Sequence, residues 1–283
     1  MTSWSRTAEN CAKHIPCCSR ATCKTDRKLY GLARYQYRPL AHGAPFSTCR
    51  SRRSPCALES TGPLFIAELE RVADGGSTLL DEIAWEYDGL FSFAVYLAAE
   101  KRDARAYGPL VRICHCSTER AHALFGDDVG TQLGRMLASV CDGDIGPLKA
   151  LAEDSAADMW CRYAALRALV VRVVEGEGDR DGVLAYIEAL AEREADVLRH
   201  LEPDDETENE TEPDDFLTWA IDAASELGPA PLLEKIRGWF GEGLIDPGVT
   251  GLKWFEKIAA MPVADCIAEA ATKEENCYIR DAL

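Results

Sequence analysis

The clearest hydrophobic pattern in the chain lies between Asp158 and Gly176. Apolar side chains recur there at intervals of three and four residues: Met159, Tyr163, Leu166, Val170 and Val173. At 100° per residue this spacing places them on one face of a helix. The opposite side is made of small or apolar residues together with one charged residue: Ala164, Ala165, Ala168, Val171 and Arg172. A helix that is apolar around most of its circumference packs on more than one side, so the pattern predicts a long buried helix.

The same spacing predicts helices through most of the chain, and no stretch shows a convincing strand pattern. The segments expected to be helical are 61–72, 91–101, a short one around 110–113, 117–124, 133–140, a short one from about 147 to 151, 158–175, 180–201, 215–227, 232–244, 252–260 and 263–272. Thr61 is the expected N-cap of the first of these, and Asp144 is the expected N-cap of the helix that contains Pro147. Residues 278–283 read as the start of another helix.

These elements predict an all-α fold. A short helix, a tight turn and a long alanine-rich helix form a pair that cannot bury both of its faces alone, and such pairs stack side by side. We therefore expect a HEAT/armadillo-like α-solenoid of stacked helix pairs over residues 58–283. Residues 202–215 hold nine acidic residues and no basic one, which predicts a solvated loop within this domain.

Residues 1–57 have a different composition, rich in Arg, Ser, Pro and Cys and without helical or alternating periodicity. Such a segment buries too little apolar surface to offset its ordering entropy, so we expect a disordered, basic tail. The formal charge is +8 over residues 1–60 and −25 over residues 61–283. The acidic body would repel nucleic acid and weakly favours basic protein partners. No apolar run approaches the ~20 residues of a membrane span and no signal peptide follows Met1, so we expect a cytoplasmic protein that does not enter a membrane.

Six of the twelve cysteines lie in the first 56 residues. Cys11, His14, Cys17 and Cys23 supply soft ligands for a tetrahedral zinc site, but their spacing fits no standard zinc finger. We keep them as weak candidates and predict no cofactor. Cys114, His115 and Cys116 are also ligand-like. On a helix the two cysteines would point about 200° apart, which favours core or edge positions over one shared ion.

Other potential sites have simpler structural interpretations. Asp142, Asp144 and Glu153 mimic an EF-hand loop, but Gly146 and Pro147 stand where an oxygen ligand and a glycine are required, which favours a helix cap. The acid pairs 127–128 and 214–215 each precede a helix, where carboxylates satisfy free main-chain N–H groups.

Catalytic signals are few. The chain has no GxSxG, Walker, GxGxxG or HExxH motif. Cys141 and His122 could form a thiol–imidazole pair only if the fold brought them together. We predict no catalytic residue and lean against an enzyme.

Four stretches resemble an uncharacterised bacterial family with HEAT-like helical repeats: ASVCDGDIGPLKALAED (138–154), CRYAALRALVVRVVEGE (161–177), GLIDPG (243–248) and YLAAEKRDARAYGPLVRI (96–113). The resemblance implies an all-helical superhelix and no known activity. Some members end in a small cysteine-rich zinc motif, which this chain lacks.

A solenoid offers an extended concave surface, so the leading hypothesis is a cytoplasmic scaffold that binds a protein or peptide in a groove. Aromatic residues on such a surface would be natural anchors, and the candidates are Trp85, Tyr87, Trp160, Trp219, Trp239 and Trp254. The alternative is an enzyme or zinc-dependent regulator whose site is assembled from residues distant in sequence. A pocket lined by several buried ionisable groups would favour the alternative, and a shallow groove with exposed aromatics would favour the scaffold.

Overall fold

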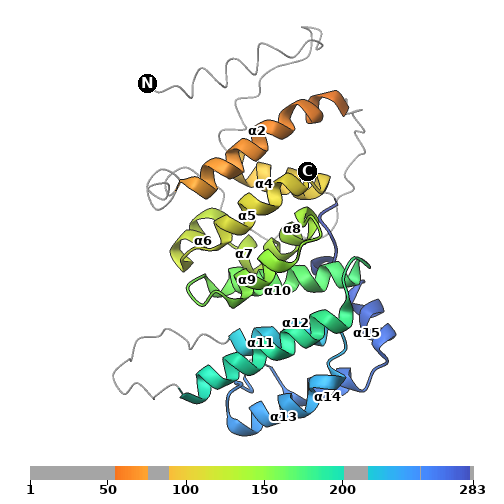
Figure 1. Cartoon of the computed structure of the whole chain (residues 1–283). Coiled ribbons are helices and arrows are strands. Elements are labelled where there is room, and N and C mark those ends of the chain that lie inside the picture. Colours follow the sequence, from red (N-terminus) through yellow and green to blue (C-terminus); the bar gives the residue numbers. More distant parts are fainter. Residues whose placement is uncertain (1–54, 76–88, 201–215, 249, 281–283) are drawn as a thin grey trace, which may run out of the picture. The chain divides into compact units, whose positions relative to one another are not determined.

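The computed structural model describes residues 55–75, 89–200, 216–248 and 250–280. These residues belong to one compact unit, Arg53–Leu283. Every regular element in the described ranges is helical (Figure 1), as the periodicity predicted. The predicted tail, the zinc candidates Cys11, His14, Cys17 and Cys23, and the acidic stretch 202–215 lie outside these ranges.

The first half of the unit contains short and medium helices. They are α2 (Pro55–Asp74), α4 (Gly89–Lys101), the 3₁₀ turn η2 (Ala104–Ala106), α5 (Tyr107–Cys114), α6 (Thr118–Phe125), α7 (Asp128–Thr131), α8 (Leu133–Val140) and α9 (Gly146–Glu153). The expected N-cap Thr61 is wrong, because α2 already begins at Pro55 and Thr61 lies inside it. Asp144 lies one residue before the N-cap Ile145, but its carboxylate still accepts a hydrogen bond from the Gly146 N–H (2.9 Å).

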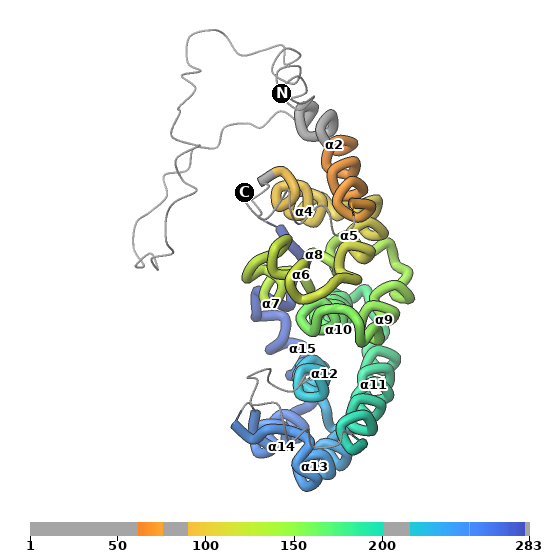
Figure 2. Tube along the Cα trace, turned by 90° about the vertical axis from the view of Figure 1, so that its left-hand side faces the viewer, coloured from red at the N-terminus to blue at the C-terminus, as the bar shows by residue number. Residues whose placement is uncertain are grey.

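The second half begins with the long central helix. Its elements are α10 (Met159–Val174), α11 (Arg180–His200), α12 (Phe216–Ser225), η3 (Ala230–Leu232), α13 (Leu233–Glu242), α14 (Leu252–Ala259), α15 (Val263–Ala270) and η4 (Glu274–Asn276). Neighbouring helices pack in sequence: α2 on α4, α8 and α9 on α10, α11 on α12, and α13 on α14. Figure 2 shows the same succession along the trace.

Helix α10 is the central element predicted from its pattern. Every residue from Cys161 to Val173 is buried, because α8, α9 and α12 cover different sides of the helix. Asp158 is its N-cap, and the Asp158 side chain accepts a hydrogen bond from the Cys161 N–H (3.1 Å). This bond satisfies one of the N–H groups that the first turn of a helix leaves unpaired.

Helices α8 and α10 cross at a glycine. A Cβ placed on Gly134 would lie 2.6 Å from the Cβ of Arg167 and 3.2 Å from the carbonyl oxygen of Ala164. Only a residue without a side chain allows the two backbones to approach this closely. The close crossing explains why small residues occupy this part of α10.

After α15 the chain returns to the middle of the unit. We call residues 273–280 the C-terminal strap; Figures 1 and 2 show it in dark blue beside α8 and α10. The backbone of Cys277 is extended and residues 278–280 are not helical, so the prediction of a helix start from Tyr278 is wrong for the described residues. The Ile279 N–H donates to the Ser139 hydroxyl (3.0 Å), and the Tyr278 N–H donates to a Glu175 carboxylate oxygen (3.0 Å). Tyr278 and Ile279 are both buried, so the strap is part of the core.

Candidate functional site

One pocket of the unit lies where the strap meets the central helices. It has a volume of about 440 Å³, and short stretches from five regions line it. The lining residues are 129–132, Gly134 and Arg135 along α7 and α8, Tyr163, Ala164 and Arg167 of α10, Asp222 and Glu226 at α12 and just beyond it, Trp254 of α14, and residues 273–275 of the strap. We call this space the central pocket.

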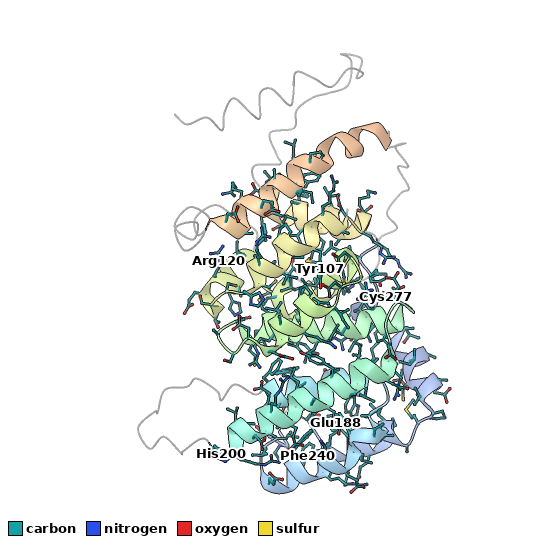
Figure 3. All side chains as sticks on the ribbon, viewed as in Figure 1. Tyr107, Arg120, Glu188, His200, Phe240 and Cys277 are labelled. Carbon is teal, nitrogen blue, oxygen red and sulfur yellow. The ribbon has the colours of Figure 1, made fainter. Side chains whose placement is uncertain are left out.

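A second cavity of about 560 Å³ continues along the strap toward Tyr96 and Arg280. It shares Gln132, Arg135, Lys273 and Glu274 with the central pocket. Cys277, labelled in Figure 3, lies in its wall. The two cavities are therefore neighbours that share part of their lining, and we call them together the central groove.

The positively charged side chains that line the central pocket bind acceptor groups of the same chain. Arg135 donates through Nε to the Cys277 carbonyl oxygen (2.8 Å) and through Nη1 to Glu274 (3.0 Å). Lys273 donates to Glu226 (2.8 Å), and Arg167 binds Asn276 and lies 3.8 Å from Glu226. These interactions hold the strap against α8 and α10, and they leave little free positive charge in the pocket.

The anionic side of the pocket is different. Asp222 accepts a hydrogen bond from the neutral Tyr163 hydroxyl, with 2.8 Å between the Tyr163 oxygen and Oδ2. Burial raises the pKa of Asp222 above its usual range, although the Tyr163 hydrogen bond and the charges of Arg167 and Lys273 act in the opposite direction. The pKa of Tyr163 is also raised, mainly by burial, so its hydroxyl stays protonated and donates. Asp222 is therefore a carboxylate with a neutral donor beside it.

Aromatic rings lie close to this carboxylate. Trp160, Trp219 and Tyr163 form a cluster, with ring centroids 4.9 Å apart for Trp160–Trp219 and 5.3 Å apart for Tyr163–Trp219. Trp254 stacks edge-on against Phe255 at 5.0 Å and is 39% exposed at the pocket.

The predicted aromatic anchors thus have different positions. Trp239 is buried, Trp160 and Trp219 are half-buried in the cluster, and Trp254 is exposed. Trp85 and Tyr87 lie outside the described residues.

The ligand-like cysteines lie elsewhere. Helix α5 ends at Cys114, so Cys116 is not on that helix and the angular argument about the two cysteines does not apply. Both thiols hydrogen-bond the thiol of Cys161 on α10. The pKa of Cys116 is raised, first by its hydrogen bond to Cys161 and then by burial, and the pKa of Cys161 is raised first by its hydrogen bond to Cys114. Thiols with raised pKa values are poor nucleophiles at neutral pH.

His115 faces an acid rather than the thiols. Its Nδ1 lies 2.6 Å from Asp154 Oδ2, and this hydrogen bond lowers the pKa of Asp154. Within the described ranges, no three or more His, Cys, Asp and Glu side chains are grouped so that they could hold a metal ion.

The remaining sequence candidates have structural roles. The Cys141 thiol lies beside the Asp144 carbonyl oxygen (3.8 Å) and the Tyr107 hydroxyl, which donates to the same carbonyl oxygen (2.7 Å). Asp142 accepts from the Asp144 N–H (2.9 Å), as expected of a turn residue.

The acid pairs gave mixed outcomes. Asp127 is the N-cap of α7, but its side chain makes no capping hydrogen bond, and Asp128 instead accepts from the Tyr96 hydroxyl (2.9 Å). The prediction that the carboxylates of this pair accept hydrogen bonds from the first N–H groups of the helix is therefore wrong. Residues 214–215 lie outside the described ranges.

Two comparisons find relatives. Residues 57–283 match the model of a family described as protein of unknown function (DUF1186). The chain belongs to the DUF1186 family. An uncharacterised protein of Chlamydia trachomatis is 26% identical over 222 residues, which is 78% of this chain and 80% of that protein. An uncharacterised protein of Chlamydia muridarum is 30% identical over 128 residues, which is 45% of this chain and 50% of that protein.

No solved structure matches the chain. The resemblance to an uncharacterised family seen in the four stretches is confirmed at the level of this DUF1186 membership. Across the described helices, none has both the length and the apolar composition needed to cross a bilayer.

Sequence reasoning did not identify the central pocket. Tyr163 was read only as part of an apolar stripe, and Arg135, Arg167 and Asp222 were not singled out. The available signal was the charge itself. Arg167 stands inside ALRALVV and Asp222 inside FLTWAIDAAS, two stretches that are otherwise apolar and helical. A charged residue within a buried helix requires a partner and often marks a site.

Proposed function

We propose that this chain is a protein- or peptide-binding module and that the central groove receives an extended segment of the partner. The observation that carries the proposal is the groove itself, two neighbouring cavities of about 440 and 560 Å³, with the exposed ring of Trp254 in the wall of the first. Partly exposed aromatic residues in concave sites are common anchors for binding.

The solenoid arrangement and a cytoplasmic location belong to the same proposal. Successive packing of α2 on α4, α8 on α10, α11 on α12 and α13 on α14 supports stacked HEAT-like helix pairs. A stack of this kind presents an extended surface to a partner. The acidic composition of residues 61–283 favours partners with a basic surface.

The test compares two variants of the groove with a matched control. Trp254→Ala removes the exposed ring, and Thr131→Arg fills the rim from an exposed position that lines the pocket. Val197→Ala is the control, because Val197 is 58% exposed on α11 and does not line the groove. All variants are first checked for an unchanged helical circular dichroism signal and melting temperature.

The full chain and its variants then capture proteins from a bacterial lysate, and the bound proteins are quantified by mass spectrometry. The expected result is a protein that the wild-type chain and Val197→Ala enrich equally and that Trp254→Ala and Thr131→Arg enrich at least ten-fold less. Equal enrichment by all four proteins, or no enriched protein, would overturn the proposal.

A second candidate is an enzyme, and one observation favours it. The central pocket is lined by several ionisable groups, among them the buried Arg135 and Arg167 and the half-buried Asp222, whose pKa is raised by burial. A carboxyl group with a raised pKa in a pocket is suited to proton transfer. A panel of chromogenic esters, amides, phosphates and glycosides tests this candidate. Turnover that disappears in Asp222→Asn would favour the enzyme over the binding module.

A further inference from the structure

We propose that the central pocket takes the side chain of an arginine from the bound segment, with its guanidinium group between Asp222 and the ring of Trp254. This inference rests on the proposed function, because it names the residue that the groove recognises.

The charges that line the central pocket indicate which sign of charge a ligand should carry. Arg135, Arg167 and Lys273 already bind carboxylates, amide oxygens or carbonyl oxygens of this chain, so an incoming anion would have to compete with internal acceptors. Among the described residues, the group that donates a hydrogen bond to the Asp222 carboxylate is the neutral Tyr163 hydroxyl, while Arg167 and Lys273 act on Asp222 through their charges. Glu275 is exposed at the rim of the pocket. The positions of the charges therefore favour a cation.

The burial of Asp222 strengthens its attraction to a nearby cation. A carboxylate that is partly removed from water gains more from a cation than an exposed carboxylate does, because the surroundings screen the interaction less. Asp222 is such a group, since burial is the main reason for its raised pKa. The charges of Arg167 and Lys273 already act on Asp222, but the group that donates a hydrogen bond to it is the neutral Tyr163 hydroxyl. An incoming guanidinium would add a positively charged hydrogen-bond donor.

The surfaces of the central pocket distinguish arginine from lysine. A planar guanidinium can stack on an aromatic face and bind a carboxylate through two parallel hydrogen bonds, whereas an ammonium group acts as a point charge. The central pocket offers both surfaces, a carboxylate and an exposed indole.

The chain contains the same combination nearby. The guanidinium of Arg162 lies 3.7 Å from the centroid of the Phe216 ring, and its Nη2 donates to Glu194 (2.5 Å). This internal site shows that the packing of α10 against its neighbours accommodates an arginine between a ring and a carboxylate. In the central pocket the ring and the carboxylate are present, and the guanidinium would come from the partner.

The test uses four pools of fluorescein-labelled pentapeptides with uncharged, randomised flanking residues. The pools differ only at the central position, which is arginine, citrulline, lysine or glutamate. Citrulline keeps the shape of arginine without its charge. Binding to the full chain is measured by fluorescence anisotropy, and the variants are Asp222→Asn, Trp254→Ala and the exposed control Asp265→Asn.

We expect the arginine pool to bind at least ten-fold more tightly than the citrulline and glutamate pools and at least three-fold more tightly than the lysine pool. Asp222→Asn should reduce the affinity for the arginine pool to that for citrulline, Trp254→Ala should weaken it at least three-fold, and Asp265→Asn should leave it unchanged. If Asp222→Asn does not fold, the comparison of arginine with citrulline on the wild-type chain still decides.

Other outcomes overturn the inference in separate ways. Equal binding of all pools would remove the arginine site and leave the peptide-binding function standing. Equal binding of lysine and arginine would reduce it to a general cation site and so refute it as stated. A retained preference for arginine in Asp222→Asn would exclude the named carboxylate. Binding of no pool also overturns it, and the lysate capture then decides separately whether the proposed function survives.

Discussion

The buried arginine Arg162 allows a sharp test of how α10 is held to its neighbours. Its side chain is 2% exposed, and it donates through Nε to the Ala152 carbonyl oxygen (3.1 Å) and through Nη2 to Glu194 (2.5 Å). Through these bonds it joins α10 to the end of α9 and to α11. The substitution Arg162→Met keeps much of the length and the apolar volume of the side chain and removes every donor.

The expected loss of stability follows from the groups left behind. Removing one partner of a fully buried ion pair costs about 3–5 kcal/mol. Glu194 is 23% exposed, so water can partly solvate its carboxylate and the cost is lower. The Ala152 carbonyl oxygen loses its side-chain donor, which adds about 1–3 kcal/mol if no water replaces it. Packing of the methionine on Phe216 offsets part of this, and we expect a net loss of about 3 kcal/mol.

The control is an ion pair in the same region that differs in exposure. Arg193 on α11 donates to Glu153 on α9 at 3.0 Å, but the two side chains are 55% and 40% exposed. Exposed pairs of this kind contribute about 0–1 kcal/mol. Arg193→Met should therefore change stability by less than about 1 kcal/mol.

Thermal and urea unfolding, followed by circular dichroism, measure both variants. A loss of ~3 kcal/mol corresponds to a decrease in melting temperature of about 6–12 °C for a unit of this size. The reasoning would be refuted if Arg162→Met and Arg193→Met lowered stability by the same amount. It would also be refuted if Arg162→Met stabilised the chain, because the buried ion pair would then be a net cost.

Three further predictions concern single positions. Gly134→Ala should lower the free energy of unfolding by about 1–3 kcal/mol, because the new Cβ would collide with Arg167. Gly241→Ala, on the exposed face of α13, should raise the free energy of unfolding by about 0.5–1 kcal/mol. Urea titrations of the two variants measure both changes. Val170→Asp places a charge at a fully buried position and should abolish cooperative unfolding in calorimetry, and a variant with an unchanged melting temperature would contradict the placement of α10. The melting temperature of Asp222→Asn minus that of the wild type should increase as the pH rises above about 4. The reason is that a carboxyl group whose pKa is raised in the folded state destabilises the fold once it ionises. A difference in melting temperature that does not change with pH would contradict this.

The helices themselves were predictable because burial imposes periodicity. The segments 133–140, 180–201, 252–260 and 263–272 correspond to α8, α11, α14 and α15 within two residues at each end. The prediction from periodicity fails where contacts with other helices determine the conformation of the chain. Residues 278–280 have a helix-compatible composition, but their main-chain N–H groups donate hydrogen bonds to the side chains of Ser139 and Glu175, which hold Ile279 and Tyr278 in a non-helical segment.

The candidate site was less predictable, because its residues meet only through the returning strap. Arg135 on α8 binds the Cys277 carbonyl oxygen, a residue 142 positions later in the chain. No local pattern encodes a bond to a main-chain carbonyl at that separation, since any residue type supplies the acceptor. Sequence periodicity therefore predicted helices that line the groove, but it could not show that the strap lies along one side of it.

The same bonds connect stability and binding in this chain. Arg135 and Arg167 are buried at the base of the groove, and each uses its charge to hold the strap rather than to face a ligand. A buried charge with satisfied hydrogen bonds fixes one arrangement of its neighbours, because any other arrangement would leave it unpaired. The strap in turn brings Glu274 and Glu275 to the wall of the pocket that Asp222 also lines. Glu274 and Glu226 bind Arg135 and Lys273, so Asp222 and Glu275 are the carboxylates through which we expect the pocket to bind a partner.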